Sequence, residues 1–271
     1  MALAVAAGVA VLAGLIAVTA LPGCASASKK KDFNPAGELE RAQKLIARGK
    51  YFKARLVLQE ALETGVADKE VTSEMQITLA DAYFHDGGTI NLAEALARYT
   101  NFLAFNPLHA RADYVQYQLA MCHFLQVYAP DKDQAQTRKA LEEFRKTAAL
   151  YPASAYAGEA EARIREGRRL LAEHEIVVGR FYAGRKAFKA AIERYKDVLD
   201  KYPRYEDKPG IYFDLAKALD RLGRTEEARA YLKLLVESYP EHEVNKSARS
   251  LLRKINRRSP LPEGIAEAIG D

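Results

Sequence analysis

Apolar residues recur at helical spacing along most of the chain, and the clearest case is the segment 174–203. In its second half the apolar positions fall three or four residues apart on one helical face: Phe188, Ala191, Tyr195 and Val198. Pro203 prevents this helix from continuing. Gly184 stands where a preceding helix must end, because glycine readily takes the left-handed conformation of a helix terminus. The segment therefore predicts two short helices joined by a tight turn.

The same arrangement recurs along the chain and predicts a repeat architecture. Small residues stand where two antiparallel helices touch, and proline or glycine separates neighbouring helices. The predicted units cover about residues 37–66, 72–107, 110–152, 174–203 and 208–240. A distance of 37 residues separates Ala191 from its equivalent Ala228, which is close to the ~34 residues of the tetratricopeptide (TPR) repeat. The sequence therefore predicts an all-α fold, a superhelical array of about five TPR helix-turn-helix repeats.

Several segments depart from the regular repeat. The turn at 85–91 is expected to be about three residues longer than in the basic unit, and the turn at 129–136 about eight residues longer. Residues 154–182 predict one long helix, because only glycines interrupt the helical pattern there. Residues 244–257 predict a final helix that caps the array with a polar face. Residues 258–271 are expected to form a flexible tail.

The chain begins with an apolar leader. Residues 1–20 are almost wholly apolar and small, which is typical of a signal-peptide core or of a membrane-spanning helix. The next four residues, Leu21-Pro22-Gly23-Cys24, resemble the bacterial lipobox, in which the cysteine receives a diacylglycerol and the leader is cleaved. We therefore expect residues 1–23 to be a lipoprotein signal peptide and Cys24 to carry the lipid anchor.

Residues 24–36 are short, polar and lysine-bearing, so they predict a lipidated tether that reaches about 40 Å when extended. Ala25, in place of aspartate, implies sorting to the outer membrane, on the periplasmic face of a Gram-negative-type bacterium. The alternative is a chance cysteine after a transmembrane helix. Pro22 and the lack of Lys or Arg near Met1 both depart from the lipobox pattern.

Charge and cysteine content change this picture little. The net charge is +5, and positive and negative residues are interleaved through the predicted helices. Only 29–31 and 253–258 approach a basic cluster, so no nucleic-acid partner is predicted. Cys122 lies within an apolar helical pattern and is expected to be a small buried hydrophobic residue.

The sequence contains no identifiable catalytic constellation. His174-Glu175 begins like a zinc-protease motif, but Val178 stands where the second histidine is required. The five histidines are scattered without metal-ligand spacing, and no serine has a Gly-x-Ser-x-Gly context. We therefore expect a protein that is not an enzyme and needs no metal or other cofactor.

Two surfaces are candidates for binding other polypeptides, because the first helix of each TPR unit lines the concave side. In the predicted N-terminal repeats, 37–152, apolar side chains flank the small packing positions: Ile77, Phe84, Tyr114, Tyr117, Met121, Phe124 and Leu125. They predict a groove for an extended peptide, or they simply bury one another. In the C-terminal repeats and capping helix, 153–257, the corresponding residues are charged: Arg180, Lys217, Asp220 and Arg221. They suit docking to a folded protein, or they form ordinary solvated surface.

The motifs and the leader together resemble the BamD family, the lipoproteins of the outer-membrane β-barrel assembly machinery. The resemblance covers about residues 33–239. Its most specific parts are Ala112-Asp113-Tyr114-Val115-Gln116-Tyr117, Tyr151-Pro152-x-Ser154-x-Tyr156, Leu171-Ala172-Glu173-His174-Glu175 and Gly179-Arg180-Phe181-Tyr182.

The resemblance implies that the N-terminal repeats hold targeting segments of unfolded outer-membrane proteins. It also implies that the C-terminal repeats dock on the POTRA domains of the barrel-forming subunit, with other assembly lipoproteins as partners. Arg194 is similar in position to the family's arginine that faces this subunit. The alternative functions are a TPR lipoprotein scaffold in peptidoglycan or cell-division processes, and a catalytic lipoprotein.

Overall fold

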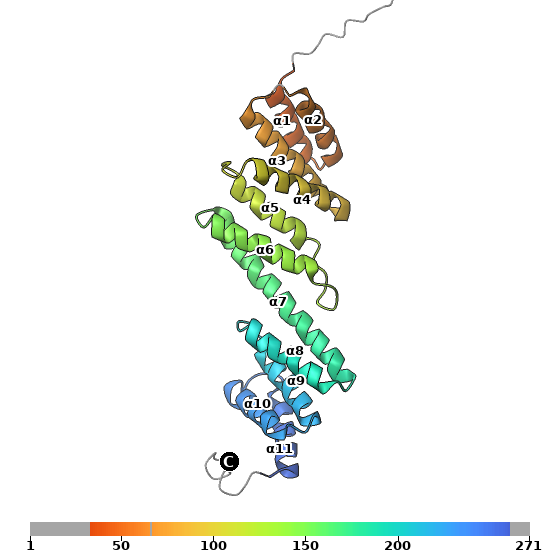
Figure 1. Cartoon of the computed structure of the whole chain (residues 1–271), viewed down its shortest axis with the longest axis vertical. Helices are drawn as coiled ribbons and strands as arrows, with labels where there is room; N and C mark the ends of the chain where they lie inside the picture. Colours follow the sequence, from red (N-terminus) through yellow and green to blue (C-terminus); the bar gives the residue numbers. More distant parts are fainter. Residues whose placement is uncertain (1–32, 66, 261–271) are drawn as a thin grey trace, which may run out of the picture. The chain divides into compact units, whose positions relative to one another are not determined.

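The computed structural model describes residues 33–65 and 67–260, and this part of the chain contains eleven α-helices and no strand (Figure 1). Their bounds are α1 (Pro35–Ala47), α2 (Tyr51–Thr64), α3 (Lys69–Asp86), α4 (Gly88–Phe105), α5 (Ala112–Phe124), α6 (Ala135–Leu150), α7 (Ala155–Gly184), α8 (Phe188–Lys201), α9 (Lys208–Arg221), α10 (Thr225–Ser238) and α11 (Asn245–Arg258). The predicted all-α repeat fold is confirmed. The predicted signal peptide, Cys24, the tether as far as residue 32 and the tail from residue 261 lie outside the described residues.

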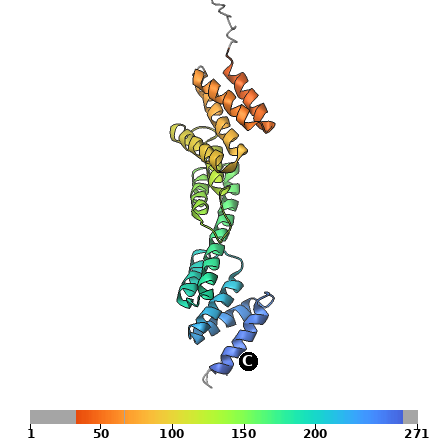
Figure 2. The same cartoon turned by 90° about the vertical axis from the view of Figure 1, so that its right-hand side faces the viewer.

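Each helix packs against the next one along the chain, from α1 to α11 (Figures 1 and 2). The buried apolar residues form local clusters that neighbouring repeats share: one joins α1, α2 and α3, and another joins α5, α6 and α7. A repeat therefore buries its apolar face only with the help of its neighbours, as expected of a solenoid. None of the described helices is both long enough and apolar enough to cross a membrane.

Small residues allow α7 to approach both of its neighbours closely. A Cβ atom added to Gly167 would lie 2.8 Å from Leu141 Cδ2 of α6, and one added to Gly179 would lie 2.5 Å from Tyr195 Cε1 of α8. Both distances are shorter than real carbon contacts, so a side chain at either position would have to displace its neighbour. The prediction that small residues stand where helices touch is confirmed at these crossings.

Three helix pairs share one turn geometry, and one of them differs from the sequence prediction. Gly49 and Gly223 have φ values of +68° and +82°, and each lies two residues beyond one helix and two before the next. In the turn after α7 this place belongs to Lys186, with φ +61°. Gly184, predicted to hold the left-handed position, is instead the last residue of α7. The turn begins two residues later than predicted, and a lysine carries the steric cost of the left-handed conformation, roughly 1–2 kcal/mol.

The two predicted long turns have opposite outcomes. The prediction of a long turn at 85–91 is wrong, because Gly87 alone separates α3 from α4. The extra residues instead lengthen both helices to 18 residues. The long connection between α5 and α6 is confirmed at 125–134. Inside it, Gln134 Nε2 donates to the carbonyl oxygens of Ala129 and Lys132 at 3.0 and 3.1 Å. His174 Nδ1 of α7 lies 2.6 Å from the Pro130 carbonyl oxygen, so this loop is held against the long helix.

The long helix and the final helix are also confirmed. Ser154 caps α7 by accepting a hydrogen bond from the Tyr156 N–H at 3.1 Å, and its own hydroxyl donates to Asp113 Oδ2 at 2.6 Å. At the end of the array, the buried guanidinium of Arg229 donates to Asn256 Oδ1 at 3.0 Å and to the Ser259 carbonyl at 2.6 Å. These bonds fasten the end of α11 to α10.

A largely buried carboxylate, that of Asp81, ties α3, α4 and α5 together. The hydroxyls of Tyr99 and Tyr114 donate to Asp81 Oδ1 at 2.5 and 2.9 Å, and Arg111 Nη2 lies 3.9 Å from Oδ2. Burial raises the pKa of the Asp81 carboxyl, while the two phenols and Arg111 limit the rise. Cys122 is buried in the same region, as predicted, and burial together with the Asp81 charge raises its pKa to about 12. This polar network depends on its donors, because an unsatisfied buried carboxylate is costly.

We predict that Gly179→Ala destabilises the fold by about 1–3 kcal/mol, because the new methyl group must displace the Tyr195 ring. Gly158→Ala is a matched control in the same helix, where the added Cβ meets open space. It should stabilise the protein by about 0.5–1 kcal/mol through helix propensity. Urea unfolding followed by circular dichroism measures both changes. Equal midpoints for the two variants would contradict the close approach of α7 and α8.

We also predict that Tyr99→Phe costs about 1–3 kcal/mol, because it removes one of the hydroxyl donors to the buried Asp81 carboxylate. Tyr195→Phe is the control: Tyr195 is equally buried, but its hydroxyl has no hydrogen-bond partner in the described residues. Its free energy of unfolding should stay within about 0.5 kcal/mol of wild type. Chemical unfolding of the two variants under identical conditions decides the matter, and a larger loss for Tyr195→Phe would refute this explanation.

Candidate functional site

The structure divides the predicted N-terminal groove residues into buried and accessible members. Ile77 is fully buried, and Tyr117 is 8% exposed. The Tyr117 ring packs 5.2 Å from the Tyr156 ring and 5.7 Å from that of Phe144, measured between centroids. For Ile77 and Tyr117 the simpler interpretation, mutual burial of apolar side chains, describes what is seen. We therefore leave these two residues out of the candidate surface.

The accessible members lie against two different core clusters. Phe84 and Tyr114 pack on the cluster shared by α3, α4 and α5, whereas Met121 and Phe124 pack on the cluster shared by α5, α6 and α7. All four are half-buried, and Leu125 is 53% exposed. Phe84 lies on α3, and the other four lie on α5 or directly after it; we call these five residues the apolar strip.

Sequence reasoning missed an aromatic residue beside this strip. Tyr156, in the first turn of α7, lies 5.6 Å from the Tyr114 ring as well as stacking on Tyr117. The sequence signal for Tyr156 was the motif Tyr151-Pro152-x-Ser154-x-Tyr156. In this motif Ser154 caps α7, which places Tyr156 in the first turn of the helix. Arg163, two turns further along α7, covers the Phe124 ring at 5.2 Å.

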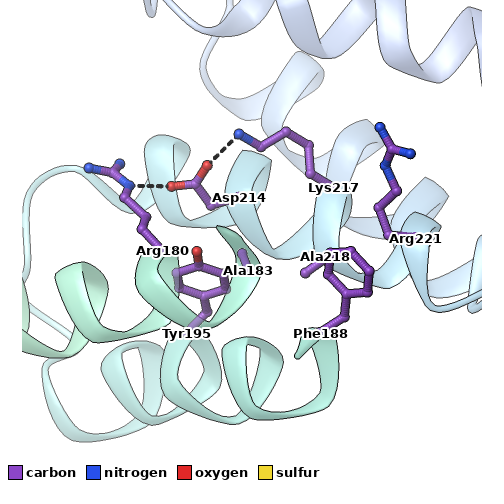
Figure 3. A pocket seen from close by; sticks show the side chains of 8 residues that line it. All are labelled: Arg180, Ala183, Phe188, Tyr195, Asp214, Lys217, Ala218 and Arg221. Carbon is purple, nitrogen blue, oxygen red and sulfur yellow. Dashed lines mark hydrogen bonds and ion pairs between the residues drawn. The ribbon is translucent and has the colours of Figure 1, made fainter. Parts of the chain in front are cut away.

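Three of the predicted C-terminal residues, Arg180, Lys217 and Arg221, converge on one hollow between α7, α8 and α9 (Figure 3). Its volume is about 310 Å³. We call it the cationic hollow, and its lining residues are Arg180, Ala183, Phe188, Tyr195, Asp214, Lys217, Ala218 and Arg221. Phe188 and Tyr195 come from α8 and give the hollow an aromatic floor below its charged rim.

Asp214 sets the electrostatics of the cationic hollow. Its Oδ2 accepts from Arg180 Nε at 2.7 Å, and its Oδ1 lies 2.7 Å from Lys217 Nζ. Burial alone would lower the pKa of Arg180, but the Asp214 hydrogen bond and charge outweigh it and raise that pKa. Burial and then the charge of Asp214 also raise the pKa of the Tyr195 phenol. Tyr195 is therefore neutral at physiological pH.

Three cations around one carboxylate leave the cationic hollow with a charge of +2. Arg221 is exposed and has no ion pair or hydrogen bond within the described residues, and no dashed line reaches it in Figure 3. A free guanidinium beside an aromatic floor can bind a carboxylate together with the apolar group next to it. The sequence pattern missed Asp214, although an aspartate three residues before Lys217 is a helix ion pair.

The other two predicted docking residues lie outside the cationic hollow. Asp220 Oδ1 accepts from Arg258 Nη2 at 2.6 Å, so it holds α11. Arg194 Nη1 donates to Glu175 Oε2 at 2.8 Å, a bond between α8 and α7 that raises the pKa of Arg194. Both pairs are partly solvated, so each contributes little to stability.

A second hollow of about 230 Å³ lies on the other side of Arg180. It is formed by the 125–134 loop, α7 and the start of α9, and its lining residues are Pro130, Glu173, Ile176, Val177, Arg180, Tyr205, Asp207 and Ile211. Arg180 therefore borders both hollows. The next exposed side chain on this part of α7 is Phe181, 56% exposed, with the Arg185 guanidinium 5.0 Å from its ring.

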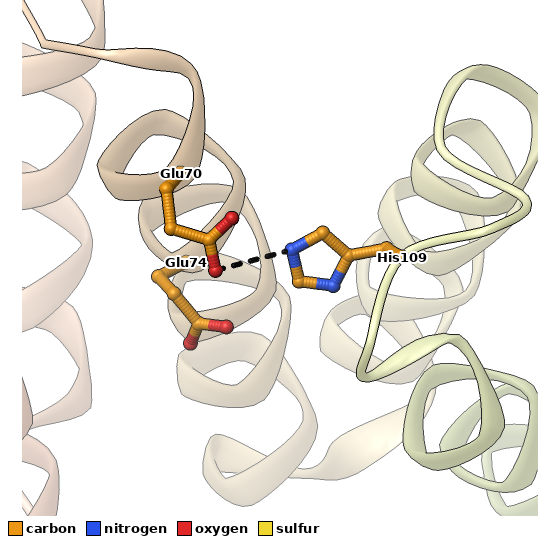
Figure 4. A group of neighbouring side chains, drawn as sticks. All are labelled: Glu70, Glu74 and His109. Atoms are coloured by element: carbon orange, nitrogen blue, oxygen red, sulfur yellow. Dashed lines mark ion pairs between the residues drawn. The ribbon is translucent and has the colours of Figure 1, made fainter.

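A group of two carboxylates and one histidine has ligand-like spacing, but its chemistry does not suit a metal. Glu70, Glu74 and His109 have ligand atoms within 4.8 Å of one another. Figure 4 shows the three side chains as neighbours, with His109 joined to Glu70. The Arg111 N–H donates to His109 Nδ1 at 3.1 Å, which places the proton of the neutral ring on Nε2. A protonated Nε2 cannot ligate a metal, and Arg111 Nη1 already donates to Glu74 at 2.6 Å. The group is better described as an ion-pair cluster.

Comparison with known proteins shows the family to which the chain belongs. The family model YfiO, described as outer membrane lipoprotein, matches residues 34–234. The chain is 29% identical over 226 residues to the outer membrane protein assembly factor BamD of Vibrio cholerae serotype O1, covering 79% of this chain and 92% of that protein. It is 32% identical over 162 residues to the BamD of Caulobacter vibrioides, covering 60% of this chain and 53% of that protein.

Among solved structures, the chain is similar to the TPR2AB domain of yeast Sti1 in its pHSP90 complex, with a TM-score of 0.43 and 14% sequence identity. The aligned part covers 83% of each chain.

The family match spans α1 to most of α10 and therefore includes the apolar strip and the cationic hollow. The chain thus belongs to the YfiO family of outer membrane lipoproteins, the BamD family that its motifs predict.

Proposed function

We propose that this chain is a non-enzymatic scaffold for outer-membrane protein assembly, which docks to the barrel-forming subunit and presents unfolded substrates to it. The observation that carries the proposal is the cationic hollow, a ready-made acceptor for an acidic group, in a chain whose matched relatives are outer membrane protein assembly factors. No bond needs to be made or broken in this role. The chain binds, holds and orients other polypeptides.

Docking belongs to α7, α8 and α9. Arg221 supplies a guanidinium without a partner among the residues that the structure describes. Arg180 uses only Nε on Asp214, so its outer nitrogens still point outward. An acidic side chain of a POTRA domain fits this arrangement, because Asp214 keeps the cations in place without neutralising all of them. Arg194 and Asp220 support the same surface from its edges, through Glu175 and Arg258.

Substrate binding belongs to the apolar strip on α3 and α5. The side chains there are aromatic or aliphatic, and the Asp81 network links α3, α4 and α5 beside them. Barrel precursors carry strands that alternate apolar and polar residues, and an unpaired strand of this kind aggregates easily. A strip that covers its apolar side chains, Phe84 and Leu125 among the contacts, keeps such a segment soluble.

We further propose that Cys24 carries the lipid anchor and holds the chain on the periplasmic face of the outer membrane, beside other assembly lipoproteins. One acyl chain gives only marginal membrane binding, whereas two or more hold a protein stably. The alternative role, a TPR lipoprotein scaffold in peptidoglycan or cell-division processes, predicts different partners. Purification in mild detergent followed by mass spectrometry separates the two, because it recovers either a barrel-forming subunit or wall and division proteins.

The substrate proposal predicts that Phe124→Ala combined with Leu125→Ala weakens binding of a carboxy-terminal peptide of an outer-membrane barrel protein by about tenfold, or ~1.4 kcal/mol. Leu150→Ala is the matched control, since Leu150 is 64% exposed at the end of α6 and is not one of the strip residues. Fluorescence anisotropy of a labelled peptide measures the affinities. If the double variant and the control bind equally well, the strip is not the peptide site.

The docking proposal predicts that Arg180→Glu combined with Arg221→Glu abolishes recovery of the barrel-forming subunit in the detergent pull-down, because it places two negative charges beside Asp214. Arg204→Glu is the control: Arg204 is an exposed arginine between α8 and α9 with no partner in the described residues. Recovery should be lost only for the first variant, provided that its circular dichroism spectrum is unchanged. Undiminished recovery with both variants folded would refute the docking surface.

A further inference from the structure

The turn between α1 and α2 exposes large apolar side chains among unpaired cations. Phe52 is 63% exposed and Leu56 51% exposed, one helical turn apart on α2. Arg48, Lys50 and Lys53 are exposed around them. We call these five residues the basic turn patch. Large exposed apolar side chains grouped with cations alone are unusual on a solvated helix. Charges of both signs are normally interspersed there, and large apolar side chains are exposed singly.

No aspartate or glutamate occurs from residue 41 to residue 59, although this stretch contains six lysines and arginines. Three of the six have acidic partners: Arg41 pairs with Glu38, Lys44 with Glu40, and Arg55 with Asp86. The remaining three are the cations of the basic turn patch, and none of them has an ion pair within the described residues. The patch therefore presents uncompensated positive charge.

The fold holds Phe52 in its exposed position from below. The Arg55 guanidinium lies 5.6 Å from the Phe52 ring and 4.5 Å from the Tyr83 ring. Arg55 Nη1 in turn donates to Asp86 Oδ2 at 2.6 Å, and its side chain is 12% exposed. Phe52 thus packs on the Arg55 guanidinium, which is itself bound to Asp86 at the end of α3. The other face of the Phe52 ring is exposed to solvent.

We infer that the basic turn patch binds the surface of a phospholipid bilayer that contains anionic lipids. Phe52 and Leu56 enter the interfacial region, while Arg48, Lys50 and Lys53 contact lipid phosphates. Apolar side chains next to lysine and arginine, without acidic residues, are the combination that interfacial membrane segments use. Each cation near an anionic surface contributes about 1 kcal/mol.

The length of the tether allows this contact, which rests on the proposed lipid anchor at Cys24. Ten residues lie between Cys24 and Pro35, where α1 begins, and the eleven steps from one Cα to the other reach roughly 36–40 Å when extended. The 13 residues of α1 span about 20 Å. The far end of α1, where the basic turn patch lies, is therefore within reach of a membrane that holds Cys24. Contact there orients the first repeat on the bilayer instead of leaving it to swing on its tether.

The absence of tryptophan from the chain provides a direct test. The full lipidated chain carrying Phe52→Trp is reconstituted into vesicles of phosphatidylethanolamine and phosphatidylglycerol, and its fluorescence is recorded. We expect a blue-shifted emission that brominated lipids quench. Leu56→Trp serves as a second reporter if the first variant folds poorly. Leu150→Trp, at an equally exposed leucine on α6, is the control and should emit as in water.

Charge dependence completes the experiment. Lys50→Glu and Lys53→Glu, added to the Phe52→Trp chain, should remove the blue shift, and so should replacing phosphatidylglycerol by phosphatidylcholine. Vesicle flotation is measured on the same samples. A chain that floats while the Phe52→Trp emission stays water-like overturns this inference alone, whereas a chain that does not float overturns the lipid anchor as well. A blue shift that requires an added protein partner instead of lipid also overturns it.

Discussion

The structure depends on the close approach of neighbouring helices, and α7 shows this most clearly. Gly167 admits Leu141 from α6 and Gly179 admits the Tyr195 ring from α8, so one long helix joins the repeats on both sides of it. No single hairpin buries enough apolar surface to fold alone, and each local core is completed by the next repeat. The same approach brings Arg180 of α7 beside Asp214 of α9, which creates the cationic hollow. Helix packing and the cationic hollow therefore have one cause.

Charge on this framework is organised by a few internal partners. Asp81 accepts hydrogen bonds from two tyrosine hydroxyls and so links helices of the N-terminal repeats. Asp214 forms ion pairs with Arg180 and Lys217 and so links α7 and α9 in the C-terminal repeats. Asp81 is nearly saturated with donors, so its role is structural. Asp214 leaves Arg221 without an ion pair in residues 33–65 and 67–260, and a surface that keeps one such cation is suited to a partner outside the chain.

The helix pattern made most of the fold predictable, because apolar periodicity and glycine turns act locally. The repeats, the long α7 and the final α11 all follow from it. Errors arose where helix length and turn length compete: the residues around Gly87 lengthen two helices, and Lys186 takes the left-handed place expected of Gly184. The local sequence pattern cannot decide such cases, because tertiary packing determines where each helix ends and the turn begins.

The binding surfaces were less predictable for a physical reason. Helical position tells which face a residue occupies, but not whether a neighbouring helix covers it, so Ile77 and Tyr117 fell in the core. Arg180, Lys217 and Arg221 converge as the repeat geometry suggests, whereas Arg194 and Asp220 are engaged elsewhere. Site-specific photo-crosslinking from position 221 in cells determines whether the cationic hollow receives the barrel-forming subunit. We expect an adduct with that subunit, whereas an adduct only with wall or division proteins would exclude this docking role.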